Sequence, residues 1–257
     1  MSEFRTVIDG FKANSDAVYE LLEFDGLVLD HVVGGLDGLA DALEAQGKRQ
    51  ASTTVRNRVA ALRNTRKNES LRPRYATIFN QCVVLLVSYF GSAVHSLFTL
   101  GVAKGLHEGH NIPAAGQDVK FLWRELSLKE VPLEEAFADL LVAQKDISFQ
   151  DMQSISRAFD AHLGIPLEQD AVTNDIILGQ ACRHVIVHAG GVVDTKMARQ
   201  VARACPRLLK PTIQVGQVIQ FEIEEVRQLG ARMGEYLDRL VTLAEARLPS
   251  SAGPISG

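Results

Sequence analysis

The sequence predicts an all-α protein, an up-and-down helical bundle. Apolar residues recur at helical spacing through most of the chain, a long uncharged stretch lies near its middle, and extended patterning is confined to one short segment. With 46% hydrophobic residues among 257, the chain can bury a sizeable core. We expect a helical arm over 1–70 packed on the bundle, a helical domain over 71–248 and a flexible tail over 249–257.

The N-terminal third is predicted to form two helices before the bundle proper. Apolar residues between positions 26 and 46 follow a three-four repeat, and Thr53–Leu62 continues as a second helix. Glycines 34, 35 and 38 weaken the first of these helices or let a neighbour pack closely. Pro73 is placed at the start of a long central helix, where a missing N–H costs nothing.

The central helix contains 22 residues without a charge, from Cys82 to Ala103, which is long enough to span a bilayer. Its small polar residues recur on one helical stripe: Ser88, Ser92, Ser96 and Thr99. Such a stripe suits the centre of a bundle, so we expect no membrane insertion. Four glycines and Pro113 within Gly101–Gly116 predict a loop or a broken helix there.

Cap signals predict the helices of the second half. Ser148 is expected to cap a helix with Asp151 as its capping-box partner, and Gly164 with Pro166 is expected to end it. The next helix is predicted over Val172–Ala189.

The last quarter is predicted to hold a short helix, an extended segment and a long helix. Asp194 is expected to cap the short helix, which Pro206 terminates. Pro211–Phe221 is the extended candidate, predicted to form a small β-hairpin insertion before the last helix, Glu222–Leu248.

Charge is segregated at the N-terminus, although the net charge of −4 argues against a generally basic surface. Residues 1–47 carry ten acids against two cations, and residues 48–74 carry nine cations against one acid. The basic run is either a surface that tracks RNA phosphates or a solvated face neutralised by the acidic helix. In the first case the substrate-binding residues are Arg63, Arg66, Lys67, Arg72 and Arg74.

The three cysteines, Cys82, Cys182 and Cys205, lack metal-ligand spacing and cannot all pair. Three unreactive thiols in a reducing cytoplasm are the simplest account. The N-terminus lacks the apolar stretch of a signal peptide, in keeping with a cytoplasmic protein.

The segment Gln180–Asp194 carries a strong cation and two imidazoles near the end of an apolar helix. Cleavage of a phosphodiester without a metal needs a proton-transfer group that works near neutral pH and a permanent cation for the phosphorane oxygens. His188 and Arg183 are residue types that supply these two roles. They are therefore the candidate catalytic pair.

Together with its flanks, this segment resembles the R-x4-H motif of the HEPN superfamily of small helical ribonucleases. Arg183 and His188 hold the motif positions, His184 fills the polar position after the Arg, and a glycine turn followed by Asp194 ends the helix. Other stretches resemble HEPN elements from residue 71 to about 240, namely 71–90, 148–165 and 214–219.

The same spacing also occurs at Arg157 and His162. Ala158 stands there where the motif has a polar residue, and this second match is interpreted as chance.

The resemblance implies a bundle of HEPN type and a metal-independent endoribonuclease, acting as a toxin or defence effector. The ribose 2′-OH would attack the adjacent phosphate and leave a 2′,3′-cyclic phosphate, without a cofactor. His188 would serve as general base or acid, Arg183 would stabilise the phosphate, and His184 would hold the substrate. Implied partners are RNA, with tRNA as a candidate, and an inhibitor or sensor protein.

The resemblance also implies a homodimer with the active site at its interface. Arg183 and His188 lie five positions apart, which is about 140° on a regular helix, so one helix does not aim both at the same phosphate. HEPN proteins resolve this by facing two motifs across one cleft.

One departure from the family supports an alternative function. Many HEPN nucleases carry an acid in the central helix, whereas residues 75–107 contain none and Gly91 and Ser92 stand nearest that place. The alternatives are a non-catalytic HEPN-like module that binds RNA, a nucleotide or a protein, and a helical interaction protein. Arg183 and His188 could also bind the last helical carbonyls, and His184 with His188 could bind a metal.

Overall fold

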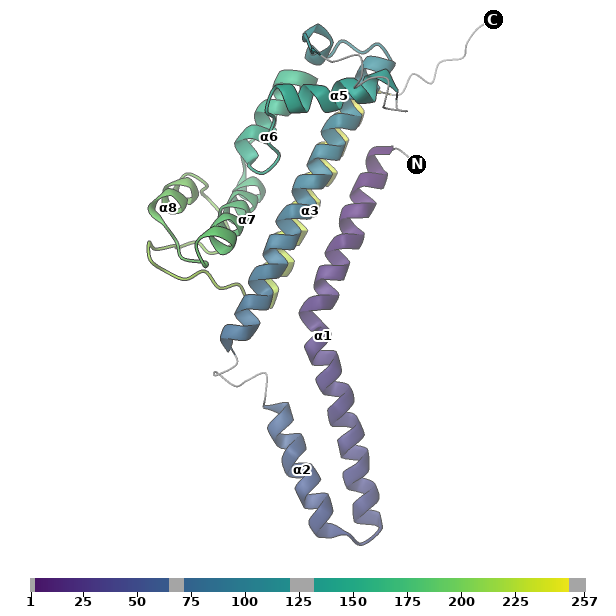
Figure 1. Ribbon diagram of the computed structural model, residues 1–257, viewed down its shortest axis with the longest axis vertical. Helices are drawn as coiled ribbons and strands as arrows, with labels where there is room; N and C mark the ends of the chain where they lie inside the picture. The colour runs from purple at the N-terminus through teal and green to yellow at the C-terminus, as the bar shows by residue number, and fades with distance from the viewer. Residues whose placement is uncertain (1–2, 65–71, 121–131, 250–257) are drawn as a thin grey trace, which may run out of the picture.

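The computed structural model describes residues 3–64, 72–120 and 132–249, with the side chains of residues 25 and 72–74 outside that description. The described part consists of helices, connecting loops and one isolated β-bridge (Figure 1). The predicted all-α class is therefore confirmed.

Three helices make up the first part of the chain. α1 spans Glu3–Ala45, α2 spans Arg49–Arg63 and α3 spans Arg72–His107. In Figure 1, α1 runs most of the length of the molecule, α2 turns back along its second half, and α3 runs beside its first half. The predicted second helix and the central helix are both present, each longer than the pattern indicated.

α3 is the central element of the bundle. It packs against α1, α5 (Leu133–Gln144), α7 (Ala171–His188) and α9 (Ile223–Arg247). Several of its apolar side chains are fully buried among these neighbours, including Leu86, Phe90, Val94 and Phe98. Burial of apolar surface on several sides of one helix is what holds the other helices around it.

The first half of α1 belongs to this same core. Phe4, Ile8, Phe11 and Leu22 are buried together with the side chains of α3 and α9. Beyond Leu22, α1 continues with α2 as a helical hairpin that projects from the bundle (Figure 1). This projecting part of α1 exposes large apolar side chains: Phe24, Leu27, Val28, Val32 and Leu39.

The loop expected over Gly101–Gly116 begins later than the glycines suggested. α3 continues through Gly101 and Gly105 to His107. A Cβ at Gly101 would lie 3.2 Å from a Leu163 methyl carbon, and one at Gly105 would lie 2.7 Å from Ile112. Both glycines therefore serve close packing within the helix and do not break it.

The helix before the motif starts differently from the prediction. Asp151, and not Ser148, is the N-cap of α6 (Met152–Ala158), because its carboxylate accepts from the Ser154 N–H at 2.8 Å. Ser148 instead accepts from the Gln150 N–H in the preceding loop. A π-helical turn, Phe159–Leu163, follows and ends as expected at Gly164, which has a φ of 67°.

The predicted cap of the short helix is confirmed, and the structure adds caps for α7 and α9. Asp194 caps α8 (Thr195–Ala202) by accepting from the Met197 N–H at 2.6 Å. α9 starts with a capping box formed by Glu222 and Glu225. α7 has Asp170 as its N-cap, which accepts from the Thr173 N–H at 2.8 Å.

The predicted β-hairpin before the last helix is not present in the described residues. Residues 211–221 form a turn, with Gly216 at a φ of 85°, and an isolated antiparallel bridge joins Val218 to Val192. This segment pairs with the loop after α7, since the Val193 N–H donates to Gln217 and the Ile219 N–H donates to Gly191. The backbone partner is therefore a distant loop, which alternation within residues 211–221 could not indicate.

The stretch Tyr75–His107 of α3 is long and apolar enough to cross a membrane, judged by length and composition. The core helix of a helical bundle passes the same test, and α3 occupies that place here.

Candidate functional site

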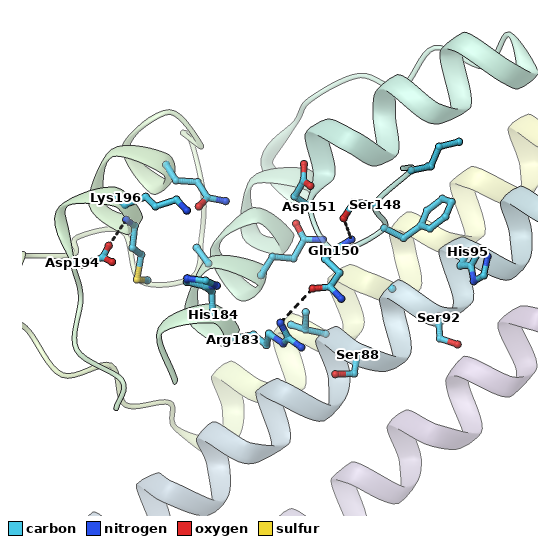
Figure 2. A pocket seen from close by; sticks show the side chains of 18 residues that line it. Ser88, Ser92, His95, Ser148, Gln150, Asp151, Arg183, His184, Asp194 and Lys196 are labelled. Atoms are coloured by element: carbon cyan, nitrogen blue, oxygen red, sulfur yellow. Dashed lines mark hydrogen bonds between the residues drawn. The ribbon is translucent and has the colours of Figure 1, made fainter. Parts of the chain in front are cut away.

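A cleft of about 690 Å³ lies between α3, α7, α8 and the loop before α6. We call it the motif cleft, because Arg183 and His184 of α7 line it (Figure 2). The segment expected to carry the site therefore borders a concave space, and two of its three candidate residues contribute to the wall.

Arg183 is partly buried at this wall. Its guanidinium donates a long hydrogen bond of 3.4 Å to the side-chain oxygen of Gln150, and it has no ion pair among the described residues. Gln150 is itself exposed on the loop before α6. Arg183 therefore keeps most of its five N–H donors for a ligand in the cleft.

Gln180 lies one turn before His184 and is 6% exposed. Its side-chain oxygen accepts from the Met152 N–H at 3.0 Å, which fixes the orientation of the amide. The Nε2 atom is buried and has no hydrogen-bond partner in the described residues. A buried donor without a partner costs free energy, so a ligand that accepts from this amide would remove that cost.

The two histidines of the motif occupy different places. His184 lines the motif cleft, whereas His188, one turn further along α7, is not among the residues that line it. Their rings are 5.0 Å apart between centroids, and both side chains are exposed. The structure therefore brings Arg183 together with His184 in the cleft and places His188 beside His184 at its edge.

The small polar stripe of α3 lies at the surface and not at the centre of the bundle. Ser88 and Ser92 are exposed and line the motif cleft together with His95 (Figure 2). A Cβ at Gly91 would lie 3.2 Å from the Phe149 carbonyl oxygen. The small residues thus allow the loop before α6 to approach α3, and this approach closes one side of the cleft.

Two carboxylates, those of Asp151 and Asp194, also line the cleft. The Asp151 carboxylate caps the N-terminus of α6, and the Asp194 carboxylate caps the N-terminus of α8. Their charge is therefore placed at helix N-termini, where the macrodipole stabilises it. The α3 positions nearest the place of the HEPN acid are Gly91 and Ser92, and no acid of α3 lines the cleft.

α8 contributes a residue that the motif did not indicate. Lys196 lines the cleft opposite Arg183 and has no ion pair in the described part of the chain. The sequence gives one indication of this residue, because Lys196 comes two positions after the N-cap Asp194, on the helix that follows the motif. Only the fold shows that this helix packs on α7 and turns Lys196 toward the cleft.

The predicted basic surface is in part neutralised by α1. Arg63 donates to Asp37 at 2.6 Å, and Arg56 donates to Asp41 at 2.9 Å and to Glu44 at 2.7 Å. For these two cations the structure favours the second interpretation of the basic run, a face neutralised by the acidic helix.

The other predicted substrate-binding residues are not placed. Arg66 and Lys67 lie outside the described residues. Arg72 and Arg74 lie in the first turn of α3, but their side chains fall outside the description.

The second R-x4-H match does not form a site. Arg157 is exposed and donates to Gln153 and Ser154 on its own helix. His162 packs against Phe98, with ring centroids 6.0 Å apart, and its Nδ1 is buried without a hydrogen-bond partner among the described residues. Burial, with Lys145 nearby, lowers the pKa of His162, so the ring is neutral in the core.

The described residues contain no metal-ligating cluster, and two of the three thiols are buried. No group of three metal-ligating side chains is present among them. Burial raises the pKa of Cys82 to about 11 and that of Cys182 to about 12, so both thiols are unreactive at neutral pH. Cys205 is a free and exposed thiol.

No protein-family model, no curated protein and no solved structure matches this chain. The function is therefore argued from the motif cleft itself.

Proposed function

We propose that the protein is a metal-independent endoribonuclease of HEPN type, a cytoplasmic toxin or defence effector, whose active site includes the motif cleft. The observation that carries this proposal is the convergence of Arg183, His184 and the unpartnered Gln180 amide on one concave surface. A permanent cation and a free donor suit a phosphate, and an imidazole beside them suits proton transfer. RNA, with tRNA as a candidate, is the proposed substrate.

The reaction needs two proton transfers. The ribose 2′-OH loses its proton to a base and attacks phosphorus, and the P–O5′ bond breaks as the 5′-oxygen takes a proton from an acid. His184, which lines the motif cleft, serves in one of these two roles, and a second imidazole serves in the other. Arg183 then stabilises the extra negative charge on the phosphorane oxygens. The products are a 2′,3′-cyclic phosphate and a 5′-OH, so no water is consumed in this step.

A homodimer is part of the proposal. Arg183 lines the motif cleft and His188 does not, so a partner's motif facing this cleft would supply the second imidazole. We place the active site at that interface. Free ribonuclease activity harms the host, so an inhibitor or sensor protein is also expected.

A second candidate function has a specific observation in its favour. No acid of α3 lines the cleft, and the carboxylates of Asp151 and Asp194 are engaged as N-caps. If HEPN-type catalysis needs that acid, the cleft binds RNA, a nucleotide or a protein without cutting RNA.

Incubation of the full chain with labelled tRNA and single-stranded RNA in excess EDTA separates the two candidates. The ribonuclease cuts unmodified RNA and leaves cyclic-phosphate ends. It does not cut the same oligonucleotide carrying 2′-O-methyl groups, because that RNA lacks the attacking hydroxyl. Binding of both RNAs without cutting of either establishes the binding module.

A further inference from the structure

A second cleft, of about 880 Å³, adjoins the motif cleft on the far side of α8. We call it the α8 cleft. The two clefts share Asp151, Lys196 and Gln200 as lining residues, so they adjoin each other along α8. A ligand larger than one nucleotide could contact both clefts.

The outer face of α8 is a row of cations. Lys196, Arg199 and Arg203 lie at spacings of three and four residues, which places them on one side of the helix, with Gln200 between them. Met197 and Val201 occupy the opposite side and are buried. Burial of the apolar side holds α8 on the bundle, so the row of cations keeps a fixed orientation relative to the bundle.

No carboxylate of the described residues neutralises these cations. Lys196, Arg199 and Arg203 have no ion pair in the part of the chain that the structure describes. Arg157, which lines the same cleft, binds Gln153 and Ser154 and no other side chain of the described residues. The carboxylates that line the α8 cleft are Asp151, the N-cap of α6, and Glu168. Four cations against two acids leave this depression positive.

A buried hydroxyl also lacks a partner in the α8 cleft. Tyr236 of α9 lines the cleft, is 4% exposed, and its hydroxyl has no hydrogen-bond partner among the described residues. An unpaired buried hydroxyl lowers the stability of the free protein, and a ligand oxygen can pair with it. This observation is independent of the charge of α8.

We propose that α8 is the substrate-binding track, along which the phosphates of single-stranded RNA pass from the motif cleft through Lys196, Arg199 and Arg203 into the α8 cleft. The inference rests on the proposed RNA substrate and names the surface that binds it. The row from Lys196 to Arg203 spans roughly 10 Å at the helical rise, which is the reach of two to three nucleotides. A strand anchored there holds a neighbouring phosphodiester at Arg183 and His184.

The matched controls come from the α1–α2 hairpin. Arg56 and Arg63 are also two arginines, but carboxylates of α1 already bind them. The variants Arg199→Ala/Arg203→Ala and Arg56→Ala/Arg63→Ala therefore remove the same charge from the chain. Tyr236→Phe removes the hydroxyl alone and keeps the buried ring.

Fluorescence anisotropy with a labelled 12-nucleotide 2′-O-methyl RNA measures binding without cleavage. We expect the α8 double variant to bind this RNA roughly tenfold more weakly, with the slope of log affinity against log salt reduced by about 1.4, because two phosphate contacts are lost. The hairpin double variant binds as the wild type does. Tyr236→Phe weakens binding by a few fold without lowering the melting temperature.

The test separates this inference from the proposed ribonuclease. The track is overturned if the α8 double variant binds with wild-type affinity, or if the hairpin control loses as much affinity as the α8 variant. It is also overturned if wild type does not bind the 12-mer. If the α8 variant loses binding but wild type does not cut unmodified RNA, the track stands and the ribonuclease proposal fails. If wild type cuts RNA and the α8 double variant binds and cuts RNA equally well, the ribonuclease proposal stands and the track fails.

Discussion

The rings of His184 and His188 lie 5.0 Å apart on consecutive turns of α7, and of the two only His184 lines the motif cleft. His184 is thus placed for proton transfer in the cleft of its own chain, whereas His188 is available to a site shared with a partner. The geometry also means that a ligand bound to Arg183 meets His184 before it meets His188. This relationship makes the two histidines distinguishable by experiment.

Replacement of Arg183 tests its role at the phosphate. Arg183→Ala is expected to lower kcat by roughly 10²–10³-fold, because a donor to the transition-state oxygens is lost. Arg183→Lys keeps the charge but not the planar fork of donors, so it restores RNA binding better than it restores the rate. Single-turnover cleavage and anisotropy, measured on the same RNA, separate the two effects. Equal rates for Arg183→Ala and wild type would remove Arg183 from the site.

Mixing inactive variants tests the proposed dimer. Arg183→Ala and His188→Ala are each expected to be inactive, and unfolding and refolding them together should restore cleavage. In a mixed dimer, one of the two sites carries both replacements. The other site combines the unchanged Arg183 of one protomer with the unchanged His188 of its partner. No recovery, with mixed dimers demonstrated by size and mass, places both residues of a site in one protomer.

The α7–α9 contact predicts opposite effects for two glycine replacements. A Cβ at Gly179 would lie 2.9 Å from a methyl carbon of Leu229, which is fully buried and can shift only by disturbing its packed neighbours. Gly179→Ala is therefore expected to lower the free energy of unfolding by about 1–3 kcal/mol. Gly234→Ala, on α9 with nothing within 4 Å of the added Cβ, should raise it by about 0.5–1 kcal/mol. Chemical denaturation measures both, and a stabilising Gly179→Ala contradicts the close packing.

The link between Asp170 and Arg239 predicts a pH dependence of stability. Burial alone raises the pKa of Asp170, but hydrogen bonds from Arg239 and Thr173 outweigh it and hold the pKa at about 2. Because the pKa in the folded state is below its ordinary value near 3.9, the carboxylate stabilises the fold above about pH 4. That stability is lost as the pH falls from about 4 to 2.

The free energies of unfolding of wild type and Asp170→Asn, measured from pH 7 to pH 2, test this link. The wild type is expected to be more stable at neutral pH, with the difference shrinking below pH 4. A difference that stays constant through this range shows that the charge of Asp170 does not contribute.

The sequence predicted the elements whose signals are local. The ranges of α7 and α9, the N-cap role of Asp194 and the end of the π-helical turn at Gly164 follow from periodicity and capping within a few residues. Each depends on backbone hydrogen bonds that one segment makes with itself.

The errors concern signals that depend on distant partners. Gly101 and Gly105 stay helical because Leu163 and Ile112 pack against them, and Val218 bridges Val192 because the two loops meet in space. The stripe of Ser88 and Ser92 was expected inside the bundle and lies in the motif cleft. In each case, local composition is compatible with both arrangements, and tertiary packing decides between them.

The lining of the motif cleft was predicted in part, and the roles of its residues stay a prediction. Arg183 and His184 were found from the motif, whereas Gln180, Lys196 and the row of cations on α8 required the fold. A basic run was visible in the sequence at residues 48–74, but the carboxylates that bind Arg56 and Arg63 come from α1. Net charge along the chain thus does not show which cations remain free to bind RNA.

The most direct test of the central claim compares wild type with His188→Ala on unmodified single-stranded RNA in excess EDTA. We predict that wild type cuts the RNA and leaves 2′,3′-cyclic phosphate ends, whereas His188→Ala binds it with unchanged affinity and cuts it roughly 10²–10⁴-fold more slowly. Equal cutting by the two proteins, or cutting that EDTA abolishes, contradicts a metal-independent ribonuclease that uses this motif.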